Sequence, residues 1–270
     1  MGYQSAVVIP VHDVNPVRRT PWVTYALIAA NVIIFLLTPA SRTVATASLG
    51  QVCQQEAFFD KYAAIPRELV HDTQLPVVAT GRVGVGPQGP GCVATRPDYH
   101  KIPVLSVLYS MFLHGGWLHL LGNMLFLWVF GNNVEDRFGR LRFLLFYLVC
   151  GYAASYGFAL ANADASTPLI GASGAIAGVL GAYLVLWPGA RVWSLVPILL
   201  FIPLRLPAWL VLGAWFVLQW VYASGVAVSA AGSVGYLAHV VGFVVGALIA
   251  LPVRLRQPPE RYRRIGYTWG

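Results

Sequence analysis

Long apolar runs, separated by short polar segments, set the pattern of this chain. A helix needs about 20 apolar residues to cross the hydrocarbon core of a bilayer. Six runs come close to that length and predict membrane-spanning helices, at residues 22–39, 117–132, 141–161, 171–187, 206–223 and 233–252. The composition agrees, since 57% of the residues are hydrophobic and 10% are charged, against about 25% charged in soluble domains. The expected fold class is an all-α polytopic membrane protein, folded as one six-helix bundle.

Basic residues gather near the ends of these runs and orient the predicted bundle. With six spans, one side of the membrane receives Arg18, Arg19, Arg137, Arg140, Arg142, Arg191, Arg205, Arg254, Arg256, Arg261, Arg263 and Arg264. Loops rich in Lys and Arg stay in the cytoplasm, so that side is predicted to be cytoplasmic and to hold both termini. The net charge of +8 is then a topology signal, and no nucleic-acid partner is expected.

Three parts make up the expected organisation of the chain. Residues 1–21 form a cytoplasmic N-terminal segment, residues 22–253 form the membrane domain, and residues 254–270 form a basic cytoplasmic tail. The first apolar run is expected to be a retained helix, because no small-residue cleavage site follows a short apolar stretch near the N-terminus.

The apolar segment 191–204 decides the number of spans. It is short for a membrane helix, and Pro197 and Pro203 interrupt it. We expect an interfacial or re-entrant piece on the cytoplasmic side. If this segment crossed the membrane, the last span would run in the opposite direction.

The extracytoplasmic loop 40–105 is too long to be a simple connector. Its stretch "QEAFFDKYAAIPRELV" predicts a short helix on the membrane surface that stops near Pro66, whereas "GRVGVGPQGPGC" has no periodicity and is expected to be mobile. Cys53 and Cys92 both lie in this loop, where oxidation is permitted, so a disulfide and two free thiols both remain open. Cys150, in the third span, is expected to be a packing residue.

Polar side chains inside predicted spans are costly and need a reason. His119 and Asn123 lie in the second span, Ser173 begins the fourth, and His239 lies about six residues into the sixth. These three spans all start on the extracytoplasmic side, and a helix rises 1.5 Å per residue, so most of the four groups fall within about 10 Å of that side. Six spans therefore permit the four side chains to meet, and seven do not.

The residue types suit acyl transfer. A serine hydroxyl becomes a nucleophile when a base takes its proton, and neutral His239 can serve as that base. The Asn123 amide, the His119 ring N–H and the Ser173 backbone N–H are candidate donors to an oxyanion. The six predicted spans contain no carboxylate to orient His239, so the expected arrangement is a dyad.

Structural readings of the same residues stay open at this point. The stretch "GASGAIAG" also fits close helix packing, and Ser173 taken alone fits a serine bonded back to its own helix. Asn123 alone fits an interhelical hydrogen bond. His114 is expected to be structural, because its five-residue separation from His119 and the lack of an acidic or cysteine partner do not suit a metal site.

Three motifs, in order and on alternate spans, resemble the rhomboid family of intramembrane serine proteases. "HGGWLHLLGNMLFLWVFGNNVEDRFG" places His119 and Asn123 in the family's H-x-x-x-N motif. "GASG" places Ser173 in the G-x-S-G nucleophile motif, and "AHVVGFVVG" places His239 in the A-H-x-x-G-x-x-x-G motif. The resemblance runs from about Pro103 to Leu251.

The resemblance implies a six-helix rhomboid core and a serine endopeptidase that cuts at the outer end of another protein's transmembrane helix. Ser173 and His239 would form the catalytic dyad, while His119, Asn123 and the Ser173 N–H would form the oxyanion hole. It implies no cofactor and no metal. Its expected partners are transmembrane protein substrates and the lipid bilayer, and its expected location is a bacterial plasma (inner) membrane with the active site open to the extracytoplasmic side.

Two departures from the family pattern change what must hold the site together. Many bacterial members have a Trp-Arg pair in the first loop, and "DYHKIPVLSVLYSMFLH" has none, so this loop must be anchored otherwise. Some members stack an aromatic residue on the catalytic histidine one turn after the nucleophile. That position is Ala177 here, so His239 must be held by another contact.

Two other functions fit the composition. A non-catalytic relative would bind membrane-protein clients, but such relatives typically lack the serine or the histidine, and both are present here. A small transporter or channel usually carries acidic residues along a path, whereas the predicted spans contain none. The substrate and the oligomeric state are not determined by these patterns.

Overall fold

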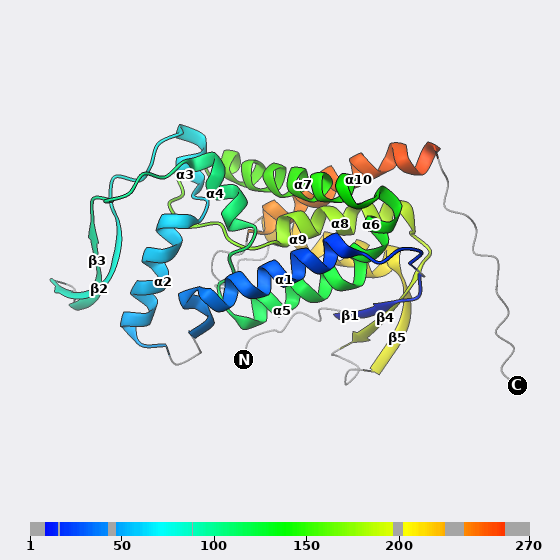
Figure 1. Cartoon of the computed structure of the whole chain (residues 1–270), viewed down its shortest axis with the longest axis horizontal. Helices are drawn as coiled ribbons and strands as arrows, with labels where there is room; N and C mark the ends of the chain where they lie inside the picture. The colour runs from blue at the N-terminus through cyan, green and yellow to red at the C-terminus, as the bar shows by residue number, and fades with distance from the viewer. Residues whose placement is uncertain are drawn as a thin grey trace, which may run out of the picture.

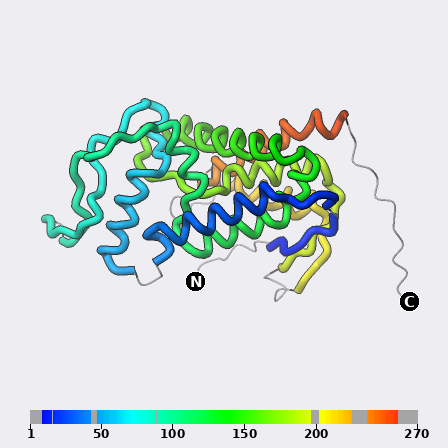
Figure 2. Tube along the Cα trace, in the orientation of Figure 1, coloured from blue at the N-terminus to red at the C-terminus, as the bar shows by residue number. Residues whose placement is uncertain are grey.

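The computed structural model describes residues 9–15, 17–42, 47–87, 89–196, 202–224 and 235–256. Most of its longer helices run side by side along the long axis, with a two-stranded hairpin at one end and a three-stranded sheet at the other (Figure 1). The same layout is visible in the Cα trace (Figure 2). The protein is therefore mostly helical, and the prediction of an all-α fold is wrong for these two small sheets.

The predicted apolar runs coincide with helices. The long helical elements are α1 (Trp22–Leu37), α5 (Trp117–Phe126) continued by the π-helical turn η2 (Leu127–Gly131) and α6 (Asn132–Phe138), α7 (Arg140–Ala161), α8 (Ser173–Leu186), α9 (Ala208–Ala223) and α10 (Tyr236–Arg256). Among the described residues, α7 and α10 are long and apolar enough to cross a membrane, and α1, α8 and α9 are shorter apolar helices. The number of membrane crossings thus stays a prediction.

Close approach of α8 and α10 forms the centre of the bundle. A Cβ added at Gly242 would overlap the carbonyl oxygen of Gly174, and one added at Gly246 would overlap that of Gly178. A Cβ at Gly181 would overlap the carbonyl of Phe243 in the same way. Small residues let helix backbones come this near. Lipid provides no hydrophobic force that pushes helices together, so close packing of this kind is what makes them associate.

The N-terminus of α1 is capped by another helix. Glu135 of α6 accepts hydrogen bonds from the backbone N–H of Val23 at 3.0 Å and of Thr24 at 2.7 Å, and from the Thr24 hydroxyl at 2.8 Å. A carboxylate at a helix N-terminus is favourable because it satisfies free N–H groups and meets the positive end of the dipole. The acidic turn after α5 thereby fixes α1 against the rest of the bundle.

The long loop between α1 and α5 is ordered by several small elements. They are η1 (Pro39–Arg42), α2 (Leu49–Tyr62), α3 (Pro66–His71), β2 (Val78–Gly86), β3 (Gly89–Thr95) and α4 (Pro103–Ser110). A capping box between Ser48 and Gln51 starts α2, and Pro66 begins α3, as its position in the first helical turn favours. The expected short helix that stops near Pro66 corresponds to α2, which begins earlier and ends at Tyr62, while Pro66 starts a second helix; its position on a membrane surface stays a prediction. The expected mobile stretch is instead the antiparallel hairpin β2–β3.

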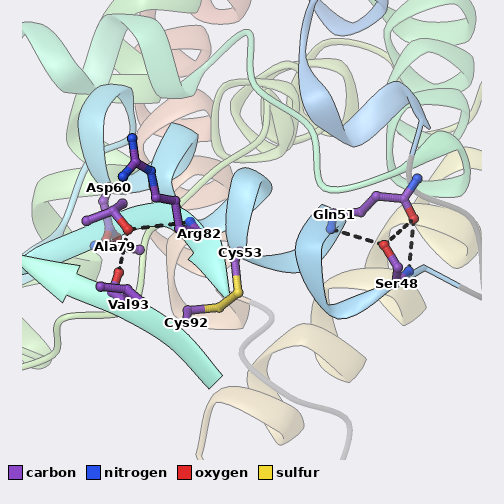
Figure 3. Close-up of a disulfide and its surroundings, with 9 residues drawn as sticks. Ser48, Gln51, Cys53, Asp60, Ala79, Arg82, Cys92 and Val93 are labelled. Atoms are coloured by element: carbon purple, nitrogen blue, oxygen red, sulfur yellow. Dashed lines mark hydrogen bonds between the residues drawn. A yellow bond between two sulfur atoms is a disulfide. The ribbon is translucent and has the colours of Figure 1, made fainter. Parts of the chain in front are cut away.

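A disulfide joins this hairpin to α2. Figure 3 shows the bridge between Cys53 of α2 and Cys92 of β3, which confirms the disulfide hypothesis. The hairpin is also held by the Asp60 carboxylate, which accepts the Ala79 N–H at 2.9 Å. Cys150 is free and buried in α7, consistent with a packing role.

The loop also contains a buried ion pair. The Lys101 ammonium lies 2.6 Å from the Glu68 carboxylate and donates to the Asp60 carbonyl oxygen at 2.8 Å. Both side chains are almost completely shielded from solvent. This pair and the disulfide anchor the loop that lacks the family's Trp-Arg pair.

The described residues of segment 191–204 belong to two paired strands, and their expected position at the cytoplasmic membrane interface stays a prediction. β4 (Arg191–Val196) pairs antiparallel with β5 (Ile202–Pro207) and with β1 (Ile9–Asp13), in the order β1–β4–β5. Along β4, Val192 and Ser194 are fully buried while their neighbours are not, which is the two-residue period of a strand. Pro197 and the other residues of 197–201 lie outside the described residues, as do residues 1–8 and 16 of the N-terminal segment and residues 257–270 of the predicted tail.

Candidate active site

A cavity of about 930 Å³ opens at the N-terminal end of α8 and collects the four polar residues singled out from the sequence. Ser173 comes from α8, His239 from α10, and His119 and Asn123 from α5, and all four line this cavity. Three separate helices thus bring a hydroxyl, two imidazoles and an amide to one place. The catalytic roles assigned to them from the motifs remain proposals.

Ser173 and His239 are in direct contact. The Ser173 Oγ lies 2.7 Å from His239 Nε2. Ser173 is the first residue of α8, reached through Gly171, whose φ of 119° is a conformation that a side chain would strain. The tight α8–α10 packing brings the two helix backbones close enough for the side chains to meet.

His119 presents one ring nitrogen to the cavity. The Gly115 backbone N–H donates to His119 Nδ1 at 3.4 Å, which makes Nδ1 an acceptor and leaves the ring proton on Nε2. A Cβ added at Gly171 would lie 2.7 Å from this Nε2 and 3.5 Å from the Ser173 Oγ. The Nε2–H is therefore available beside the serine, and Gly171 provides the room for it.

Asn123 has an unused donor. Its side chain is 8% exposed and lines the cavity, and its Nδ2 has no hydrogen-bond partner among the residues that the structure describes. A buried amide N–H₂ without a partner is costly unless a ligand uses it. The alternative of an Asn123 that only bridges two helices does not account for this free donor group.

The backbone of Ser173 adds a third donor. As the first residue of α8, its N–H has no carbonyl partner within the helix. The N-terminus of a helix also favours negative charge. The Ser173 N–H, the Asn123 amide and the His119 Nε2–H thus border a cavity that suits an anionic oxygen.

Two residues of α9 that were missed from the sequence hold His239. The Gln219 Oε1 lies 2.7 Å from His239 Nδ1. The Trp215 ring packs on the imidazole, with 5.9 Å between ring centroids and 34° between planes. Trp215 takes the place of the aromatic residue absent at Ala177. The sequence did hold one signal, because Gln219 is the only glutamine in the six predicted spans.

The long loop forms part of the wall around this cavity. Leu169, just before the GASG motif, donates its N–H to the Ala64 carbonyl at 2.7 Å, and Ala64 donates to the Ser110 hydroxyl at 2.6 Å. Gln55 of α2 donates to the Gly115 carbonyl at 3.3 Å, and Phe59 lines the cavity. The loop therefore supports both the nucleophile segment and the His119 segment.

His114 is fully buried and packs edge-on against His119, with 5.1 Å between ring centroids. Within the described ranges, no group of three or more His, Cys, Asp or Glu side chains is arranged to hold a metal ion. The contact with His119 is consistent with the structural role expected for His114.

Comparison with known proteins identifies the family. The Rhomboid domain model matches residues 103–256, more than half of the chain. Rhomboid protein 1, mitochondrial, of Saccharomyces cerevisiae is 34% identical over 171 residues, which cover 60% of this chain and 45% of the yeast protein. Rhomboid protease GluP of Bacillus subtilis is 44% identical over 78 residues, 29% of this chain and 15% of that protein.

The chain belongs to the rhomboid family, and it is an integral membrane protein. RHOMBOID-like protein 5 of Arabidopsis thaliana is another relative, 39% identical over 78 residues, which cover 29% of this chain and 25% of the plant protein. The chain spans less than half the length of each of these three relatives. Of these three relatives, the Bacillus subtilis protein is the one named as a protease.

Proposed function

We propose that the protein is an intramembrane serine endopeptidase that hydrolyses a peptide bond in or near the end of a substrate's transmembrane helix. The observation that carries this proposal is the 2.7 Å contact between Ser173 Oγ and His239 Nε2 beside the free donors of Asn123 and His119. Nucleophile, base and oxyanion donors are the parts that acyl transfer requires.

The reaction would proceed in two halves. His239 Nε2 takes the Ser173 proton as Oγ attacks the substrate carbonyl carbon, and the carbonyl oxygen becomes an oxyanion facing the Asn123 amide, the His119 Nε2–H and the Ser173 N–H. Collapse returns the proton from His239 to the leaving amine and leaves an acyl-enzyme. Water then attacks that ester with His239 as base, and Ser173 is released.

The substrate must supply an accessible peptide bond. Helical peptide bonds are shielded by their own hydrogen bonds, so a cleavable segment has to unwind. Residues that weaken a helix, such as Gly or Pro, should mark the cleaved region of a transmembrane substrate. We propose that this region lies at the extracytoplasmic side of a bacterial plasma membrane, as the arginine distribution predicts.

Reconstitution with a tagged single-span substrate tests the proposal. Wild-type protein should cleave it, whereas Ser173→Ala and His239→Ala should not, and Ser224→Ala on the exposed end of α9 should behave as wild type. A serine-directed fluorophosphonate should label the wild-type protein and not Ser173→Ala. Cleavage that survives Ser173→Ala would contradict the mechanism.

The oxyanion donors can be tested with the dyad intact. Asn123→Ala should lower kcat by about 100-fold to 1,000-fold, the usual cost of one oxyanion-hole donor, and should leave folding unchanged. An unchanged kcat would remove Asn123 from the site. The alternative function, a non-catalytic relative that binds membrane-protein clients, predicts a bound but intact substrate in every one of these assays.

A further inference from the structure

His239 has a second polar contact that the dyad leaves without a role. Its Nε2 faces Ser173 Oγ at 2.7 Å, and its Nδ1 faces Gln219 Oε1 at the same distance. Gln219 lies on α9, twenty residues before His239 in the chain, and its side chain is half-buried at the cavity wall. The imidazole is thus held between a hydroxyl on one helix and an amide on another.

A neutral imidazole carries one proton, so one ring nitrogen donates and the other accepts. To remove the Ser173 proton, Nε2 must be the acceptor, which requires the ring proton to be on Nδ1. An amide oxygen next to Nδ1 favours that tautomer because it accepts the Nδ1–H. An amide nitrogen there would favour the opposite tautomer, in which Nε2 already carries a proton and cannot act as base.

We infer that Gln219 is a positioning residue for the proposed reaction: its Oε1 accepts the Nδ1–H of His239, holds the base-competent tautomer and aims Nε2 at Ser173. The inference rests on the proposed function. It converts the dyad expected from the sequence into a chain of three residues, in which a neutral amide takes the place that a carboxylate has in other serine hydrolases.

The contact also suits the charged state of the base. When His239 accepts the serine proton, the Nδ1–H still points to Gln219 Oε1, and a hydrogen bond from a cation is stronger than one from a neutral ring. A carboxylate at this position would have to be desolvated inside the membrane domain, which is costly. A glutamine orients the ring without a buried charge.

The neighbouring aromatic rings do not perform this task. Trp215 packs on the imidazole and Tyr236 meets its edge, with ring centroids 5.9 Å and 6.4 Å away. Ring contacts restrict the tilt of the imidazole, but the indole N–H is a donor and accepts nothing. Among the described residues, Gln219 is the one recorded hydrogen-bond partner of His239 Nδ1.

Three variants test the role of the amide oxygen. Gln219→Met keeps the length of the side chain and removes the acceptor, whereas Gln219→Glu keeps an oxygen in reach of Nδ1. Val217→Met introduces the same new residue on an exposed position of α9 and serves as the matched control. Each is measured for kcat and KM on the tagged substrate, for the rate of fluorophosphonate labelling, and for its thermal unfolding midpoint.

Loss of the acceptor should appear in kcat and not in KM. We expect Gln219→Met to lower kcat and the labelling rate by about tenfold to 100-fold, in the range of other lost supporting contacts, with KM changed by less than about twofold. Gln219→Glu should retain most of the wild-type kcat, and Val217→Met should equal wild type. A wild-type kcat in Gln219→Met would overturn the inference, and so would equal losses of kcat in the Met and Glu variants when both unfold at the wild-type temperature, since the cost of burying a charge would lower that temperature.

A spectroscopic measurement on the wild-type protein does not depend on any variant folding. With ¹⁵N-labelled histidine, the neutral His239 ring should show its proton on Nδ1, and a proton on Nε2 would overturn the inference. Failure of the proposed function looks different: the wild-type protein would lack Ser173-dependent labelling and cleavage. An active wild type with an unaffected Gln219→Met removes the inference alone.

Discussion

The α8–α10 interface and the loop between α1 and α5 are stabilised in opposite ways. At the interface, Gly178 and Gly246 let two backbones touch, and the contact is almost entirely apolar. In the loop, a disulfide, a buried ion pair and a short hairpin hold helices that bury few apolar side chains. Both regions border the same cavity.

The difference follows from the solvent on each side. Lipid is as apolar as a leucine side chain, so helices in it associate through close packing of small residues. In the predicted topology the loop lies outside the hydrocarbon region, where water competes for its hydrogen bonds. Its core is small, so cross-links provide its stability. The cavity thus lies between these two regions. The closely packed α8–α10 interface fixes Ser173 and His239, and the cross-linked loop supports them.

The largest effect is expected where the close approach is broken. In Gly246→Ala, the new Cβ would overlap the Gly178 carbonyl, and a backbone atom cannot rotate away. The two helices must separate, at a cost of about 5 kcal/mol or more, comparable with the whole stability of a small domain. The matched control is Gly213→Ala in α9, where a Cβ would meet open space.

Thermal unfolding in detergent and Ser173 labelling measure this prediction. Gly246→Ala should unfold at a lower temperature and lose labelling, because Ser173 and His239 lie on the two helices that separate. Gly213→Ala should be neutral or slightly more stable, since alanine favours a helix over glycine by about 1 kcal/mol. Equal behaviour of the two variants would show that close packing does not hold this interface.

The next effect concerns the ion pair of the loop. Burial lowers the pKa of the Lys101 ammonium, and the Glu68 carboxylate opposes that shift. Lys101→Met leaves the carboxylate buried without its partner, which costs about 3–5 kcal/mol. The chain's other lysine, Lys61, is exposed, so Lys61→Met is the control and should change stability little.

Protease digestion of the loop measures this loss better than global unfolding does. Lys101→Met should be cut within the loop at a much lower protease concentration than wild type, because the cost falls on the loop. A loop that resists cleavage as well in Lys101→Met as in Lys61→Met would mean that the ion pair does not hold it.

The disulfide should contribute somewhat less. It closes a separation of 39 residues, and a cross-link of this size stabilises a fold by about 2–4 kcal/mol. The double variant Cys53→Ser/Cys92→Ser should lower the free energy of unfolding of the loop by that amount, and its unfolding temperature should fall accordingly. Reductant should have the same effect on wild-type protein and none on the double variant, and a wild type that is insensitive to reductant would refute the role of the bridge.

The smallest effect is expected at a buried polar cluster, where the contrast between an apolar interface and a polar loop does not hold. At the C-terminal half of α8, a buried polar cluster joins the bundle to the sheet: Asp13 Oδ2 accepts from Tyr183 Oη at 2.8 Å and from Asn133 Nδ2 at 2.7 Å. Burial disfavours the charged carboxylate and raises the pKa of Asp13 to about 6. The folded chain then keeps a proton that the unfolded chain releases near pH 4.

Stability should therefore fall as the pH rises from about 4 to about 6. Asp13→Asn keeps an oxygen acceptor without a charge, so above pH 6 it should be more stable than wild type by about 1–3 kcal/mol. Below pH 4 the two should be alike. Unfolding temperatures across this pH range measure the difference, with the exposed Asp98→Asn as control; a constant difference would argue against titration of Asp13.

The positions of the helices and of the four polar site residues were predictable because each depends on a local pattern. Apolar runs predicted the helices, and the depth of Ser173, His119, Asn123 and His239 within those runs predicted that they could meet. The strands near 191–207 were missed because an apolar segment bounded by prolines fits several structures. The hairpin in the loop was missed because its glycine-rich stretch lacks any period.

By itself, the sequence determined that the chain is a membrane protein of mostly apolar helices, with a hydroxyl and an imidazole near corresponding helix ends. Only the tertiary structure decided which groups touch: Gln219 and Trp215 on His239, Cys53 with Cys92, and Lys101 with Glu68. The reason is physical. Apolar length is a property of neighbouring residues, whereas a contact within 3 Å depends on how whole helices approach, and that is set by packing across the fold.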